Sequence, residues 1–170
     1  MIVLKAIRPR RLRDDALRLA LLNEMRKVAT EIKKDFAKTT ATWAHRVQFT
    51  VLVSLTGPGP VVLVGTDDRV YRYVDEGTRP HLIFAGIYTG KSKKKALAFR
   101  GAFRAKTTPR VIGSGAGFKG GALVLRPYVQ HPGTEARQFD VTIQGSWEPR
   151  FKRRMEAAMV QAAAKSGHGA

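Results

Sequence analysis

The chain has 170 residues and carries 31 Lys and Arg against 13 Asp and Glu, a formal net charge of +18. Its 44% of hydrophobic residues argues against wholesale disorder and predicts one domain over residues 1–170. The lack of cysteine excludes disulfides and thiolate metal sites. Because no run of 18 apolar residues occurs, we expect a soluble intracellular protein without a membrane partner.

The first predicted element is a long helix from about residue 11 to 38. Leu22, Met25 and Ala29 are spaced by three and four residues, which places them on one helix face. The threonine-rich stretch that starts at Thr39 is expected to end the helix, because β-branched residues lose rotamer freedom there.

An antiparallel sheet is predicted from about residue 46 to 139. Val47–Leu55 alternates apolar and polar residues, and Gly57–Pro60 leads into the apolar run Val61–Val64, so a hairpin is expected. Val70–Asp75 is predicted as a third strand. Shorter extended segments are expected at Leu82–Ala85, Ala96–Phe99, Pro109–Ile112 and Ala122–Leu125.

A basic, glycine-rich insertion in this sheet is expected between about residues 86 and 121. No carboxylate occurs from Gly77 through Thr134, whereas eleven Lys and Arg do, and Gly113–Gly121 is predicted as a mobile loop. This charge pattern favours a negatively charged partner or DNA. The contacts are expected from Lys91, Lys93, Lys94, Lys95, Arg100, Arg104, Lys106, Arg110 and Lys119.

Helical spacing returns from about residue 147 to 165, where Trp147, Met155 and Ala158 share one face. Pro149 is tolerated in a first helical turn. The order of elements predicts an α+β fold, with a long N-terminal helix and a C-terminal helix packed on the antiparallel sheet.

Signatures of catalysis are weak, and we predict no catalytic, metal-binding or cofactor-binding residues. The histidines at 45, 81, 131 and 168 lack the spacing of a helical metal clip, and His81 and His131 are expected to hydrogen-bond within turns. The acidic pairs Asp67–Asp68 and Asp75–Glu76 would suit Mg²⁺ in a nuclease, which is the least favoured class.

A nucleic-acid-binding module is a stronger alternative. Tyr88, Phe99, Phe103 and Phe118 lie among the cations of the insertion. Rings that stack on bases and lysines that follow phosphates form single-strand binding grooves, although the same rings also suit an apolar core or interface.

Three motifs occur in a fixed order along the chain: EGTRPH (Glu76–His81), KALAF (Lys95–Phe99) and VQHPGTEARQF (Val129–Phe139). With the N-terminal helix and the hairpin, this order resembles the tail-component family of long-tailed double-stranded-DNA phages. Members of that family are described as tail-completion or head-to-tail joining (neck) proteins. Gln138 stands where the family pattern leads us to expect a proline.

The resemblance implies a structural, non-enzymatic virion protein that forms a homo-oligomeric ring in the tail or neck, with six-fold symmetry expected. Implied partners are the tail terminator, the stopper, the tail tube and the DNA that passes through the channel. Assembly would occur in the host cytoplasm. The choice between a tail-completion role and the terminator or stopper roles stays open.

Two similar turns flank the insertion and are expected to form its base. Glycine permits tight turning, proline restricts the backbone, and threonine hydroxyls bond nearby backbone groups. The turns comprise Gly77, Thr78, Pro80 and His81 on one side, and His131, Pro132, Gly133 and Thr134 on the other.

Overall fold

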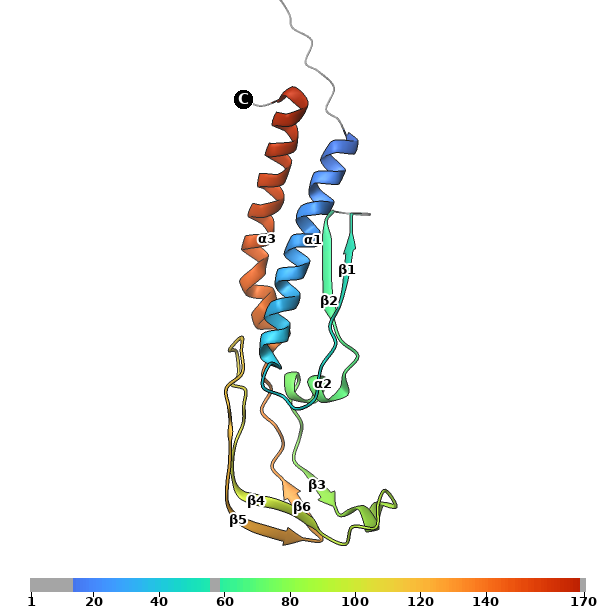
Figure 1. Cartoon of the computed structure of the whole chain (residues 1–170), viewed down its shortest axis with the longest axis vertical. Coiled ribbons are helices and arrows are strands. Elements are labelled where there is room, and N and C mark those ends of the chain that lie inside the picture. The colour runs from blue at the N-terminus through green and yellow to red at the C-terminus, as the bar shows by residue number, and fades with distance from the viewer. Residues whose placement is uncertain (1–13, 56–58, 169–170) are drawn as a thin grey trace, which may run out of the picture. The chain divides into compact units, whose positions relative to one another are not determined.

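The structure, a computed structural model, describes residues 14–55 and 59–168 and has the expected α+β fold, with a long helix near each end and small antiparallel sheets (Figure 1). The elements in chain order are α1 (Asp14–Thr39), β1 (Thr50–Ser54), β2 (Val61–Gly65), α2 (Arg69–Asp75), β3 (His81–Phe84), the 3₁₀ turn η1 (Gly86–Thr89), β4 (Leu97–Arg104), β5 (Phe118–Arg126), β6 (Tyr128–His131), α3 (Phe139–Ala163) and the π-helical turn η2 (Ala164–His168).

The described residues form two compact units. The helical unit comprises residues 14–33, 50–55, 59–65 and 145–168, and the arm unit comprises residues 34–49 and 66–144. The chain passes from one unit to the other within both long helices, α1 and α3.

In the helical unit, the core comes from one face of each long helix. Met25 of α1 and Trp147 and Met155 of α3 are buried, as the helical spacing predicts, and Val28 of α1 is buried as well. The predicted start of α1 at about residue 11 lies outside the described residues, and its predicted end is confirmed at Thr39.

An ion-pair cluster joins α1 to α3 in this unit. The Arg154 guanidinium donates to the Glu24 carboxylate at 2.6 Å and to the Glu31 carboxylate at 2.8 Å. Partial burial alone would raise the pKa of Glu24, but the hydrogen bonds and charges of Arg154 and Lys27 together lower it. The charge of Arg154 in α3 is therefore balanced by carboxylates of α1.

The predicted hairpin of the helical unit is confirmed. β1 pairs with β2 in an antiparallel register from Thr50↔Gly65 to Ser54↔Val61. The expected turn at Gly57–Pro60 falls partly on residues 56–58, which lie outside the described residues.

In the arm unit, an aromatic cluster surrounds the buried ring of Tyr71 in α2. Its centroid lies 5.2 Å from that of Phe49, 6.0 Å from Phe139, 6.3 Å from Trp43 and 6.4 Å from Phe36. Aromatic pairs at such distances add about 0.5–1.5 kcal/mol to the free energy that burial contributes. The cluster therefore ties the end of α1, the segment before β1, α2 and the start of α3 into one core.

The prediction that Val70–Asp75 forms a strand is wrong, because this segment lies in α2. The Asp68 carboxylate accepts a hydrogen bond from the Tyr71 backbone N–H at 2.8 Å and caps the helix. Tyr71 and Asp75, four residues apart, are buried on one helix face. The alternating pattern of VYRYVD also fits this helical spacing.

The C-terminal helix begins at Phe139, well before the predicted start at about residue 147. The buried Asp75 carboxylate accepts from the Phe139 backbone N–H at 2.6 Å, and the Gln138 N–H donates to the Asp75 carbonyl. Pro149 therefore lies inside α3, where it removes one helical hydrogen bond, to Gly145.

The single predicted sheet is also wrong in detail, because the described strands form three separate two-stranded sheets, β1–β2, β3–β6 and β4–β5. Glycine and proline interrupt the extended runs, and α2 occupies the place of one strand. The segment Pro109–Ile112 is not extended as predicted, since Arg110 adopts a left-handed φ of 59°. The end of the predicted loop Gly113–Gly121 is ordered as the start of β5.

Candidate functional site: a basic arm on two paired turns

The two similar turns lie side by side and pair through their backbones. The Thr78 N–H donates to the Thr134 carbonyl at 2.9 Å, and the Thr134 N–H donates to the Thr78 carbonyl at 3.1 Å. The Thr78 hydroxyl also accepts from the Thr134 N–H at 3.0 Å. We call residues 77–80 and 132–134 the base, and residues 81–131 the arm.

Both turns of the base require glycine. Gly77 has a φ of 77° and Gly133 has a φ of 92°, a region that L side chains rarely adopt. A Cβ at Gly77 would lie 2.6 Å from the Thr134 carbonyl oxygen, and one at Gly133 would lie 2.3 Å from the Thr78 carbonyl oxygen. The close backbone approach therefore excludes larger residues at either position.

The two histidines occupy the first paired position of the arm. His81 lies opposite His131 in the β3–β6 register, and the ring centroids are 5.1 Å apart. Nδ1 of His81 lies 2.8 Å from the Arg79 carbonyl oxygen, and Nδ1 of His131 accepts from the Gly133 N–H at 3.1 Å. Both rings therefore hydrogen-bond to their own turns.

The arm consists of two two-stranded ribbons joined end to end. β3 pairs with β6 from His81↔His131 to Phe84↔Tyr128, and β4 pairs with β5 from Leu97↔Arg126 to Arg104↔Phe118. On one side of the arm a single residue, Pro127, links β5 to β6. On the other side, β3 and β4 are separated by η1 and the lysine-rich segment. A register shift between Arg100 and Ala102 marks a bulge in β4.

The nine cations predicted to contact a partner lie in different parts of the arm. Lys91, Lys93, Lys94 and Lys95 precede β4, whereas Arg100 and Arg104 lie in β4 and Lys119 in β5. Lys106 and Arg110 lie between β4 and β5, where Lys106 donates to the Thr42 carbonyl and Arg110 to the Gln138 side chain at 3.1 Å. They thus lie on several segments of the arm, and of the nine only Arg100 and Lys119 line the groove described next. Their contact with DNA or a partner stays a prediction.

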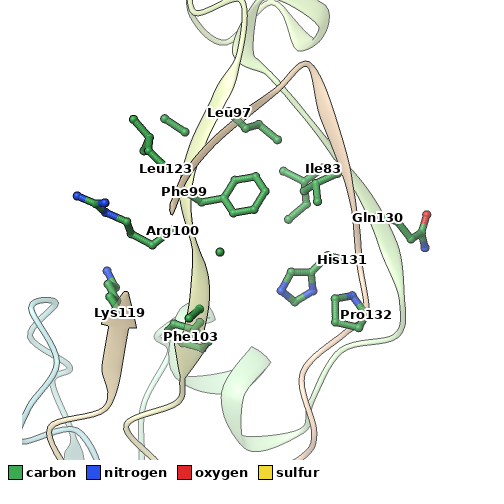
Figure 2. Close-up of a pocket in the computed structure, with 14 residues that line it drawn as sticks. Ile83, Leu97, Phe99, Arg100, Phe103, Lys119, Leu123, Gln130, His131 and Pro132 are labelled. Atoms are coloured by element: carbon green, nitrogen blue, oxygen red, sulfur yellow. The ribbon is translucent and has the colours of Figure 1, made fainter. Parts of the chain in front are cut away.

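A groove of about 870 Å³ separates the inner faces of the two ribbons (Figure 2). Phe99 and Leu97 of β4 point toward Ile83 of β3 across this groove, and Val129 of β6 lies on its wall. Pro132 and His131 line its end next to the base. The sequence did not predict this groove, because its walls come from segments that are separated by up to about 50 residues.

The outer faces of the ribbons also carry exposed apolar side chains. Arg100, Leu123 and Gln130 lie at the edge of the groove, and Figure 2 shows the side chains of Arg100 and Gln130 pointing away from its centre. Antiparallel register places Leu82, Phe84 and Tyr128 on the same outer face as Gln130, and the Phe84 and Tyr128 rings lie 6.0 Å apart. The large exposed residues of these outer faces are Leu82, Phe84, Leu123, Leu125 and Tyr128.

Arg137, three residues after the end of the base, is a buried arginine that the sequence did not identify. Arg137 donates through Nε to the Thr107 hydroxyl at 3.2 Å and pairs with Glu135 at 3.5 Å. The next residue, Gln138, adopts a φ of 53°, which a proline ring cannot reach. The expected proline is therefore incompatible with the local backbone of this chain.

The acidic pairs considered for Mg²⁺ have structural roles. Asp68 caps α2, and Asp75 accepts the hydrogen bond at the start of α3. Asp68 also contacts His45, and this hydrogen bond is the main cause that lowers the pKa of Asp68. Within residues 14–55 and 59–168, no three His, Asp or Glu side chains form a group that could hold a metal ion.

No described helix combines the length and the apolar character needed to span a membrane. Comparisons of the chain with models of protein families, with curated proteins and with solved structures gave no match.

Proposed function

We propose that the protein is a non-enzymatic structural subunit of a phage neck or tail, which completes the tail and helps to join it to the DNA-filled head as part of a ring. The motifs EGTRPH, KALAF and VQHPGTEARQF support this proposal by their order. The partners would be further copies of the chain, which we expect to form a hexamer, together with the tail terminator, the stopper and the tail tube.

The observation that carries the proposal is the arm itself. It projects from a base that glycine and backbone pairing hold closely together, and it presents exposed apolar side chains on faces that a monomer leaves in water. Large exposed apolar surfaces in soluble proteins are typical of interaction sites. A subunit that assembles with others would bury them.

The test is to silence the gene during particle production and to examine the products by negative-stain imaging and gradient sedimentation. We expect full heads and free tails to accumulate without joining. Intact, infectious particles in normal yield would contradict the assembly role.

A nucleic-acid-binding module is the second candidate, because the exposed rings Tyr88, Phe103 and Phe118 lie in a segment with eleven cations and no acids. Such binding would weaken steeply with salt, since each neutralised phosphate releases counterions. Tight, salt-sensitive DNA binding by the purified monomer, together with normal particle assembly without the protein, would favour this candidate.

A further inference from the structure

We propose that the groove between the inner faces of the arm binds an extended acidic segment of another assembly protein, with apolar side chains placed between Phe99 of β4 and Ile83 of β3. This inference rests on the proposed assembly function and names the chemistry of one partner. The partner segment would alternate or mix carboxylates with aliphatic residues.

The walls of the groove indicate what enters it. Leu97, Phe99, Ile83 and Val129 line both sides, so the occupant must offer apolar surface. Arg100 and Lys119 lie at the edge of the same groove, where they could pair with carboxylates of the occupant. An apolar interior with cations at its edge suits a segment that mixes aliphatic side chains with carboxylates.

The charge of the arm indicates the sign of the partner. From Gly77 through Thr134 the chain has eleven Lys and Arg and no carboxylate, and the nearest acids along the chain, Glu76 and Glu135, lie just outside the base. A second copy of this chain, with its net charge of +18, is a poor electrostatic complement. A segment rich in Asp and Glu from a different protein would be attracted.

The volume of the groove indicates the length of the segment. Strands rise about 3.4 Å per residue, lie about 4.8 Å apart and pack in layers about 10 Å thick, so an extended residue fills about 160 Å³. The groove of 870 Å³ thus accommodates about five extended residues.

One matched pair of variants separates the groove from the rest of the arm. Phe99→Asp places a carboxylate on the inner wall, and Leu125→Asp places the same charge on the outer face of the same ribbon, at a residue that does not line the groove. Phe99 is 36% exposed and Leu125 is 62% exposed, so neither side chain supports a buried core, and circular dichroism of both variants checks that they fold.

Binding is measured by fluorescence polarisation of a labelled ten-residue peptide of alternating Glu and Val, with the full-length protein at low salt. We expect Phe99→Asp to weaken binding about tenfold or more and Leu125→Asp to change it about twofold or less. A matched peptide of alternating Gln and Val should bind about tenfold more weakly than the acidic peptide. Equal losses in the two variants would overturn the proposal.

A labelled ten-nucleotide oligo-dT is the nucleic-acid control. The +18 chain will bind it through its surface charge, and the two variants, which add the same charge, should weaken that binding equally. Selective loss of oligo-dT binding in Phe99→Asp would identify the groove as a nucleic-acid site instead, which overturns the proposal.

Complementation of the silenced gene separates this inference from the proposed function. Joined particles with Leu125→Asp and unjoined heads and tails with Phe99→Asp would support both. If both variants restore joining while the silenced strain does not, the groove proposal fails and the assembly function stands. If particles join without any complementation, the assembly function fails, and the peptide assay alone decides whether the groove binds acidic segments.

Discussion

The helical unit and the arm differ in how their charges are paired. In the helical unit, Arg154 lies between Glu24 and Glu31, so a cation and its counter-charges come from the same chain. In the arm, Arg100 donates to the Gly121 carbonyl at 3.3 Å, and no acid occurs anywhere from Gly77 through Thr134. The helical pair is thus complete within one molecule, whereas the arm has charges and apolar faces for which a partner is the natural complement.

Because of this difference, we expect substitutions in some regions to affect folding and substitutions in others to affect assembly. Changes in the aromatic cluster, the base and the helix contacts should lower the free energy of unfolding. Changes on the inner wall of the arm should leave folding intact and alter binding.

The largest loss of stability is expected from Tyr71→Ala, which removes the ring at the centre of the aromatic cluster. Replacing a large buried aromatic residue by alanine costs about 3–5 kcal/mol. Urea unfolding followed by circular dichroism measures this loss. Tyr71→Phe, which keeps the ring, should cost far less, and equal losses in the two variants would contradict a packing role for the ring.

The next largest effect is expected from Gly133→Ala in the base. Its Cβ would lie 2.3 Å from the Thr78 carbonyl oxygen, and its φ of 92° disfavours any L side chain, so we expect a loss of about 2 kcal/mol or more. Hydrogen exchange of the Thr78 and Thr134 amides should rise in parallel with the loss in unfolding free energy.

Gly145→Ala in α3 is the matched control for the base. A Cβ at Gly145 meets no atom within 4 Å, and alanine is favoured over glycine in a helix, so this variant should be about 0.5–1 kcal/mol more stable than the parent. If both glycine variants destabilise the protein to the same degree, the base has no special requirement for glycine.

A smaller loss is expected from Arg154→Met, which keeps most of the side-chain length but removes the charge between α1 and α3. Because the Arg154 side chain is partly exposed, at 29%, we expect a cost of about 1 kcal/mol. The difference should shrink in high salt, measured by urea unfolding. A salt-independent loss would indicate that packing, and not charge, holds this contact.

The smallest effect is a change with pH, expected for Asp75→Asn. Burial is the main cause that raises the pKa of Asp75 in the folded protein, and the nearby charge of Asp140 adds to it. The folded state therefore holds the proton more tightly than the unfolded state. The contribution of this group to the free energy of unfolding is therefore fully present below the ordinary carboxyl pKa of 3.8. It is lost as the pH rises from there through the raised pKa of the folded protein.

Asparagine keeps the acceptor for the Phe139 N–H but does not titrate. The unfolding free energy of the parent, relative to Asp75→Asn, should therefore decrease as the pH rises from 3.8 through the raised pKa of Asp75. Parallel pH profiles of the two proteins would contradict a shifted Asp75.

The helices could be predicted from the sequence because their signals are local. Met25 and Ala29, four residues apart, report the buried face of α1 directly, and the threonines after residue 38 mark its end. The apolar spacing of Val70–Asp75 fits both a strand and a helix, so this pattern alone does not show that the segment is helical. The capping role of Asp68 was the signal that could have decided between them.

The base could be anticipated because both turns carry the same residue types, and such turns pair readily across a ribbon. The groove could not, since it depends on how far the chain bends at Pro127 and on the long-range register of β4 with β5. Neither Arg137 nor the left-handed Gln138 has a sequence pattern that marks it. Both positions are set by tertiary contacts to Thr107 and Arg110.

Each of the two ribbons of the arm has only two strands, so both long edges of each described ribbon carry backbone groups that another strand could engage. Like-charged arms repel one another, and lysine beside a strand edge is a common safeguard against such engagement. The cluster of lysines before β4 would therefore keep newly made subunits apart until their partners arrive. Concentrated salt, which screens this repulsion, would be the condition in which the isolated protein precipitates.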